Sequence, residues 1–178
     1  MKEEIEDNVI DDILVAAYPE YKEKFPERYV DHYLEQYRIY LLIFDNLSDR
    51  RQKSNEFFLA LNTAIMGIMG YFEIKTISAS SVIFILVPLV GMAICLCWYR
   101  MILSYSQLNR AKFKVIHLLE KKLPAKLFDT EWNILGEGRD KNKYYPLSHA
   151  ERLIPIIFTV LYIIIFIVNS PVSKFLGF

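Results

Sequence analysis

The sequence predicts an all-α integral membrane protein with three transmembrane helices and a cytoplasmic helical domain. Three apolar segments, residues 57–72, 82–99 and 153–168, carry this prediction, because none of them contains Asp, Glu, Lys or Arg. A hydrocarbon core about 30 Å thick requires about 20 helical residues, with about 17 as the lower end. Each segment reaches that length once its flanking Ser, Ala, Ile, Leu and Asn residues are counted.

Charge is segregated along the chain as strongly as hydropathy. The 178 residues are 53% hydrophobic and 24% charged, with a formal net charge of zero. Residues 1–56 hold 14 Asp or Glu and 8 Lys or Arg, a net charge of −6, and the remainder carries +6. Two solvated faces explain this split, and so does docking of the acidic segment on the basic one.

The distribution of basic residues predicts the orientation. Residues 100–152 hold 11 Lys or Arg, whereas Lys75 and Lys174 are alone on the opposite side. Basic loops stay in the cytoplasm, so the N-terminus should be cytoplasmic. The resulting segments are a cytoplasmic acidic and aromatic part at 1–55, transmembrane helices at 56–74, 79–103 and 152–170, a cytoplasmic basic helical part at 104–151, and an extracytoplasmic tail at 171–178.

The N-terminal segment predicts two helices separated by prolines. Apolar residues at helical spacing indicate a short acidic helix over residues 1–18, which Pro19 should end. Pro26 stands where a second helix can begin. From Glu27 no proline follows until Pro88 and no glycine until Gly67, so this second helix should run from about residue 27 into the first span.

An aromatic stripe follows that second helix. Its members recur every three or four residues and therefore share one face. Such a face is typical of packing against another helix, with an aromatic ligand box as the alternative. The stripe consists of Tyr29, Tyr33, Tyr37, Tyr40 and Phe44.

The first span also carries polar and small residues that are candidates for helix association. Asn62 should face other helices, because polar side chains are costly in lipid, although lining a pore is the alternative. Ala60, Ala64 and Gly67 form a small-residue face that suits either hairpin packing or oligomerisation. Gly91 and Cys95 form a second such face in the second span.

A charged collar, residues 48–56, immediately precedes the first span. Arg50 and Arg51 can bind carboxylates through their planar guanidinium groups, or they can anchor the chain to lipid head groups. The expected carboxylate partners are Asp45, Asp49, Glu120 and Glu131. The remaining packing candidates are Asn55 in the collar, Trp98 at the end of the second span, and Trp132 in the cytoplasmic part.

Catalytic and metal-binding patterns are missing from the sequence. His32, His117 and His149 are scattered without metal-ligand spacing, and Cys95 and Cys97 lie about 200° apart on a helix. No nucleotide-binding, nucleophile-elbow or zinc-protease motif occurs. We therefore expect no enzymatic activity and no cofactor. Nucleic acid is not an expected partner, because membrane topology and anionic head groups explain the basic segment.

Several stretches resemble the RipA family of octameric bacterial membrane proteins. They are LSDRRQKSNEFFLALNTA at 47–64, WYRMILSYSQLNRAKFKVIHLLEKKLP at 98–124, the pair Glu131–Trp132, and HAERLIP at 149–155. The resemblance runs from about residue 27 to 170 and implies a homo-octamer in the cytoplasmic membrane. It implies no reaction.

Two classes of function fit these observations. The first is a non-enzymatic homo-oligomeric scaffold, or an assembly related to the envelope or to stress. The second is an oligomeric pore or channel, similar to two-span effectors that form rings in bacterial defence. Polar residues along a central axis would favour the pore, and an apolar axis would favour the scaffold. The expected partners are further copies of the chain and membrane lipids, and any other protein partner stays open.

Overall fold

The described part of the chain is built from helices alone. The computed structural model describes residues 18–74, 81–138 and 147–169, and no strand occurs among them. The elements are α2 (Tyr18–Lys24), α3 (Tyr29–Ile74), α4 (Ser81–Glu120), α5 (Leu127–Ile134), the single 3₁₀ turn η1 (Gly136–Gly138) and α6 (Leu147–Asn169). The all-α prediction is confirmed for these residues.

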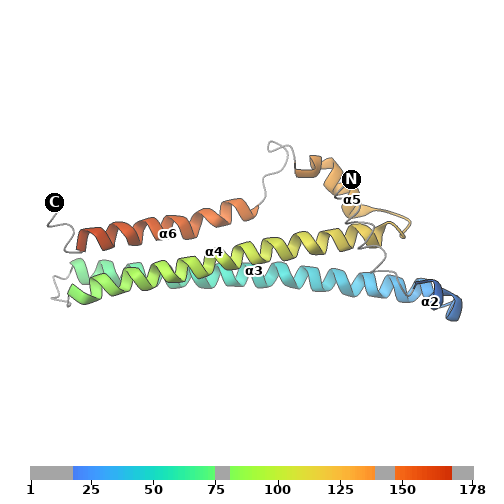
Figure 1. Ribbon diagram of the computed structural model, residues 1–178, viewed down its shortest axis with the longest axis horizontal. Coiled ribbons are helices and arrows are strands. Elements are labelled where there is room, and N and C mark those ends of the chain that lie inside the picture. Colours follow the sequence, from blue (N-terminus) through green and yellow to red (C-terminus); the bar gives the residue numbers. More distant parts are fainter. Residues whose placement is uncertain (1–17, 75–80, 139–146, 170–178) are drawn as a thin grey trace.

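Helix α4 is the centre of an elongated bundle, with α3 and α6 packed along it (Figure 1). Helices α3 and α4 run antiparallel, because Phe58 stacks on Trp98 with ring centroids 5.8 Å apart, whereas Phe44 meets Phe113 at 4.9 Å. With a rise of about 1.5 Å per residue, α3 extends about 70 Å and α4 about 60 Å. Both helices are therefore about twice as long as a hydrocarbon core is thick.

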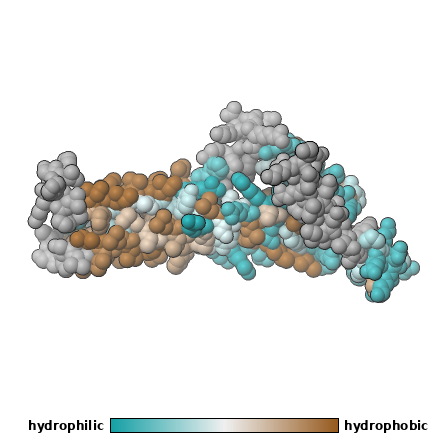
Figure 2. Space-filling model, in the orientation of Figure 1, coloured by the Kyte–Doolittle hydropathy of each residue, from teal (hydrophilic) through white to brown (hydrophobic). Residues whose placement is uncertain are grey.

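Hydropathy divides the bundle along its length. In Figure 2 one end is almost entirely hydrophobic, whereas the other mixes hydrophilic and hydrophobic residues. Two helical stretches of the described chain, Ile83–Glu120 and His149–Asn169, are long and apolar enough to cross a membrane. Most of their surface is exposed in the single chain, as at Leu96 (63%) and Ile157 (56%), which is expected where lipid or another subunit covers a helix.

The prolines occupy positions where a helix can accept them. Pro19 lies inside the first turn of α2, where backbone N–H groups are unpaired and a proline loses no hydrogen bond. Pro26 precedes α3, which begins close to the predicted residue 27. The predicted helix over residues 1–18 falls almost entirely outside the described residues. Pro88 and Pro155 are fully buried inside α4 and α6. A proline inside a helix leaves the carbonyl four residues earlier without its helical donor, and membrane helices tolerate this because neighbouring groups can satisfy that carbonyl. The Thr159 hydroxyl donates a separate hydrogen bond of 2.7 Å to the carbonyl of Pro155 itself.

Candidate functional site

A cluster around the amide of Asn62 links all three long helices. We name Asn62 of α3, Cys95 of α4 and Tyr162 of α6 the amide cluster. Asn62 is fully buried, and its Oδ1 accepts hydrogen bonds from the Tyr162 hydroxyl at 3.2 Å and the Cys95 thiol at 3.3 Å. Its Nδ2 donates to the Phe58 carbonyl at 2.7 Å. Both polar atoms of the Asn62 side chain are therefore hydrogen-bonded, the oxygen to α4 and α6 and the nitrogen to its own helix.

The ring of Tyr162 reaches this position only because residue 91 is glycine. A Cβ atom at Gly91 would lie 2.4 Å from Cζ of Tyr162, far inside van der Waals contact. The ring thus lies directly on the backbone of α4, and its hydroxyl extends past it to Asn62. The small face of Gly91 and Cys95 serves to seat α6 on α4.

The other small-residue face points outward. Ala60, Ala64 and Gly67 are all exposed on α3, and a Cβ atom at Gly67 would have no neighbour within 4 Å. Thr63 beside them is exposed too, and its hydroxyl donates to the Leu59 carbonyl of its own helix. This face therefore takes no part in packing among the residues that the structure describes.

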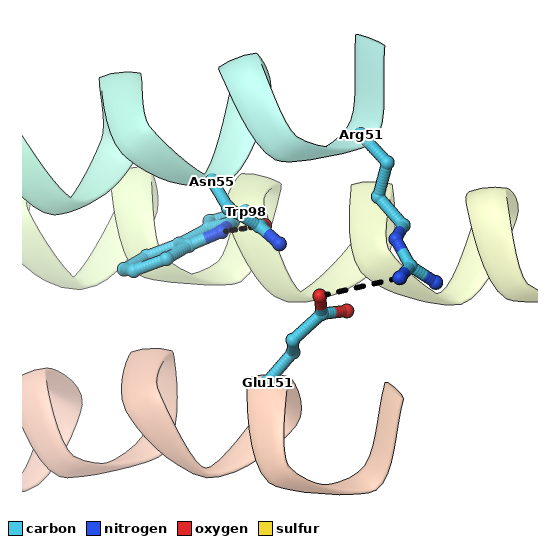
Figure 3. Close-up of polar contacts among 4 residues, drawn as sticks. All are labelled: Arg51, Asn55, Trp98 and Glu151. Atoms are coloured by element: carbon cyan, nitrogen blue, oxygen red, sulfur yellow. Dashed lines mark hydrogen bonds and ion pairs between the residues drawn. The ribbon is translucent and has the colours of Figure 1, made fainter. Parts of the chain in front are cut away.

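The collar joins α3 to α4 and α6 through polar contacts (Figure 3). Nη2 of Arg51 lies 3.6 Å from Oε1 of Glu151 at the start of α6. Trp98 is fully buried, and its Nε1 donates to Oδ1 of Asn55 at 2.9 Å. Arg50 is exposed. The carboxylate that the structure places beside Arg51 is thus Glu151, which is not one of the four partners named from the sequence.

A cavity of about 390 Å³ opens beside this ion pair. Helices α3 and α6 form its sides, and Trp98 of α4 contributes between them. Polar and apolar side chains both line it. The lining residues are Ser48, Asp49, Arg51, Gln52, Asn55, Glu56, Leu59, Trp98, Leu147, Glu151 and Ile154.

A second buried cluster lies in the polar half of the bundle. We name the Glu120 carboxylate and the groups that donate to it the carboxylate cluster. Glu120 is fully buried at the end of α4. It accepts hydrogen bonds from the Tyr37 hydroxyl (3.0 Å) and from the backbone amides of Phe128 (3.0 Å) and Asp129 (3.1 Å). Because these amides belong to the first turn of α5, Glu120 caps a helix that has no side-chain cap of its own.

The aromatic stripe is the packing surface that α3 presents to α4. Tyr33 donates its hydroxyl hydrogen to the Leu119 carbonyl, and Tyr37 donates to Glu120. Burial, and then the hydrogen bond and negative charge of Glu120, raise the pKa of Tyr37 to about 12. Burial also raises the pKa of Tyr40, whose ring lies 4.8 Å from Nζ of Lys112.

The residues with catalytic potential are dispersed. Among residues 18–74, 81–138 and 147–169, no group of three or more His, Cys, Asp or Glu side chains could hold a metal ion. Nδ1 of His32 hydrogen-bonds the Tyr21 hydroxyl, and the ring of His117 contacts Phe113 in α4. Trp132 is 37% exposed on α5.

Sequence reasoning missed Tyr162 and the capping role of Glu120. Tyr162 is the only tyrosine inside the third apolar segment, and a hydroxyl in lipid requires a partner as an amide does. The available signal for this contact was that Asn62 in the first span and Tyr162 in the third both need a hydrogen-bond partner. Glu120 offered a weaker signal, because its partners are backbone amides that any sequence supplies.

The sequence model of the octameric membrane protein family (8xMP) matches residues 34–171. The match covers most of the chain, including all of α4, α5 and α6 and most of α3. No curated protein and no solved structure gives a significant match. The finer resemblance to the RipA family stays a prediction.

Proposed function

The chain belongs to the octameric membrane protein family, and on this premise we propose that it is a non-enzymatic homo-oligomeric scaffold of a bacterial cytoplasmic membrane, of the RipA type. The observation that carries the proposal is the uncovered face of α3. A self-assembling protein needs a surface that its own fold leaves free, and α3 offers one along its length.

Three aligned spans are the first part of the proposal. The apolar segment of α3 lies beside the two candidate spans, because Asn62 bonds to both Cys95 and Tyr162. Near the collar, Trp98 contacts Phe58 of α3 and Phe158 of α6. The α3 segment thus occupies the same depth as α4 and α6. Its 16 residues, 57–72, would span about 24 Å, and with the residues that flank it the segment approaches the thickness of a hydrocarbon core.

The orientation follows from the charged residues. All three helices change from apolar to charged at the level of the collar, where Glu56, Arg100 and Arg152 stand. The polar half of the bundle, with the carboxylate cluster, would then lie in the cytoplasm under the positive-inside rule.

The interface is the second part of the proposal. Ala60, Ala64 and Gly67 lie on the side of α3 that faces away from α4, and small residues allow close helix approach in lipid. On the same helix beyond the collar, Ile39 and Leu42 are 47% and 56% exposed. These two side chains lie outside the apolar half of the bundle, so in an isolated subunit they would be exposed to water. We assign this face to a neighbouring copy of the chain.

A scaffold fits better than a pore because of where the polar groups of the spans lie. Asn62 and Tyr162 are buried between helices, and the Thr63 hydroxyl bonds its own helix. Tyr71, near the end of the first apolar segment, is the other exposed hydroxyl-bearing side chain among the described residues of the spans, and the rest of their exposed surface is apolar. An ion-flux measurement on vesicles containing the assembled protein separates the two functions, since a scaffold gives no flux above that of empty vesicles.

The interface can be tested by enlarging one small residue. Ala64→Leu should reduce the oligomer to smaller species, measured as mass by native mass spectrometry in mild detergent. Ala93→Leu is the matched control, because it makes the same change at an exposed alanine of α4. If Ala64→Leu keeps the full oligomer mass, this face of α3 is not the interface.

A further inference from the structure

The cavity at the collar has the polarity profile of a phospholipid. Along α3 its lining passes from Ser48 and Asp49 through Arg51 to Leu59, a distance of about 16 Å at 1.5 Å per residue. The polar end lies at the charged collar, and the apolar end, with Leu59 and Ile154, lies at the start of the apolar segments. A lipid in the adjoining leaflet presents its head group and acyl chains in the same order.

The charges of the lining select among head groups. Among the lining residues that the structure describes, Arg51 is the one cationic side chain, whereas Asp49, Glu56 and Glu151 are three carboxylates. Glu56 accepts a hydrogen bond of 2.8 Å from Gln52. A head group that carries only negative charge would meet this acidic surplus, whereas one that joins a phosphate to a cation matches both signs.

One carboxylate of the lining residues has an oxygen that lacks a hydrogen-bond donor. Oε2 of Glu151 is buried and has no hydrogen-bond partner. Oε1 has only the 3.6 Å contact with Arg51, which is longer than a well-formed hydrogen bond. Leaving a buried acceptor unpaired costs about 1–3 kcal/mol, and more for a charged group. A primary ammonium has three N–H donors, whereas a quaternary ammonium has none.

We propose that this cavity binds an aminophospholipid, a lipid whose phosphate is linked to a primary ammonium. Arg51 binds the phosphate, the Glu151 carboxylate accepts a hydrogen bond from the ammonium, and an acyl chain lies against Leu59 and Ile154. The weak Arg51–Glu151 contact is exchanged for two stronger charge-assisted contacts with the lipid. The site requires the membrane position of the bundle and does not depend on the number of subunits.

Three phospholipids with identical acyl chains test the site on the unmodified full-length protein in mild detergent. Phosphatidylethanolamine supplies phosphate and N–H donors, phosphatidylcholine supplies phosphate and a cation without N–H, and phosphatidylglycerol supplies phosphate without a cation. Native mass spectrometry should show phosphatidylethanolamine binding about tenfold more tightly than the other two, the value of one charge-assisted hydrogen bond. Equal affinity for phosphatidylethanolamine and phosphatidylcholine overturns the proposal.

A variant locates the selectivity. Glu151→Gln keeps the shape of the side chain but removes its charge, and should lower the affinity for phosphatidylethanolamine to that for phosphatidylcholine. Asp45→Asn, an exposed acidic position of α3 outside the cavity, should leave the preference intact. Loss of preference in Asp45→Asn as well, or its survival in Glu151→Gln, rejects Glu151 as the selective group.

The oligomer mass recorded in the same spectra separates this proposal from the scaffold. An intact oligomer that binds the three lipids equally leaves the scaffold standing and removes the lipid site. A second outcome is that Glu151→Gln binds no lipid and also forms a smaller oligomer. That result would mean that a neighbouring subunit occupies the cavity, and it also overturns the lipid site.

Discussion

The two fully buried polar side chains of the described core, Asn62 and Glu120, perform the same task in different surroundings. Each fixes α3 to α4 and to one further helix, α6 for Asn62 and α5 for Glu120. Asn62 lies within the apolar segment 57–72, whereas Glu120 is the last residue of α4, in the charged part of the chain beyond the second apolar segment. The first uses a neutral amide and the second a carboxylate.

The surroundings explain this difference in chemistry. An ionised side chain within a bilayer is costly even when it is paired, whereas a neutral amide needs only one or two hydrogen-bond partners. Glu120 meets two backbone amides at the N-terminus of α5, where the helix dipole stabilises a negative charge. The difference predicts that the carboxylate cluster contributes more stability than the amide cluster.

The largest expected effect is that of Glu120→Ala. Removing the carboxylate leaves the amides of Phe128 and Asp129 without their acceptor, and should lower the free energy of unfolding by about 3 kcal/mol. Hydrogen exchange of the α5 amides should accelerate, while exchange in the apolar half of α4 stays slow. Unchanged exchange in α5 would show that Glu120 does not hold this helix.

The second-largest effect is expected for Gly91→Ala. It should lower the free energy of unfolding by about 2 kcal/mol, because the new Cβ overlaps the Tyr162 ring. Thermal unfolding in mild detergent measures the effect. Gly67→Ala makes the same change on a helix face with no neighbouring atom within 4 Å, so in the isolated subunit it should be neutral or slightly stabilising. Equal melting of the two variants would contradict the seating of Tyr162 on α4.

Tyr37→Phe should cost about 1 kcal/mol, since it removes one hydrogen bond to a carboxylate. It should also change the alkaline response. The pKa of Tyr37 is raised from 10.0 to about 12 in the folded chain, so its contribution is complete below pH 10 and lost as the pH rises towards 12. A wild-type protein that loses no more stability than Tyr37→Phe over this range would contradict the assignment.

The smallest effect is expected from Tyr162→Phe, which keeps the ring on Gly91 and removes only the hydroxyl. Hydrogen bonds between membrane helices contribute about 0.6 kcal/mol on average, so the melting temperature should fall only slightly. A loss as large as that of Glu120→Ala would reverse the proposed ranking of the two clusters.

The composition of each segment predicted most of the architecture because it acts locally. The absence of proline between Glu27 and Pro88 allowed one helix into the first apolar segment, and α3 runs unbroken from Tyr29 to Ile74. The helical spacing of the aromatic stripe identified the face of α3 that packs. The family resemblance at the collar and in α4 is supported by the match over residues 34–171.

Local sequence patterns did not predict which side chains pair with one another. Helical periodicity shows which face of a helix is covered but not which helix covers it. From the sequence, several carboxylates could therefore pair with Arg51. The position at which α6 packs along the bundle places Glu151 beside it. The cavity beside this pair forms between α3 and α6, which both pack against α4.

The sequence by itself determined that this protein is helical and enters a membrane, since hydropathy and helix length depend on adjacent residues. The tertiary structure decided that Asn62 meets Tyr162 across 100 residues and that Glu120 caps α5. These contacts depend on the register in which long helices pack. That register is set by steric details, such as the missing side chain of Gly91 beneath the Tyr162 ring, which composition and periodicity do not encode.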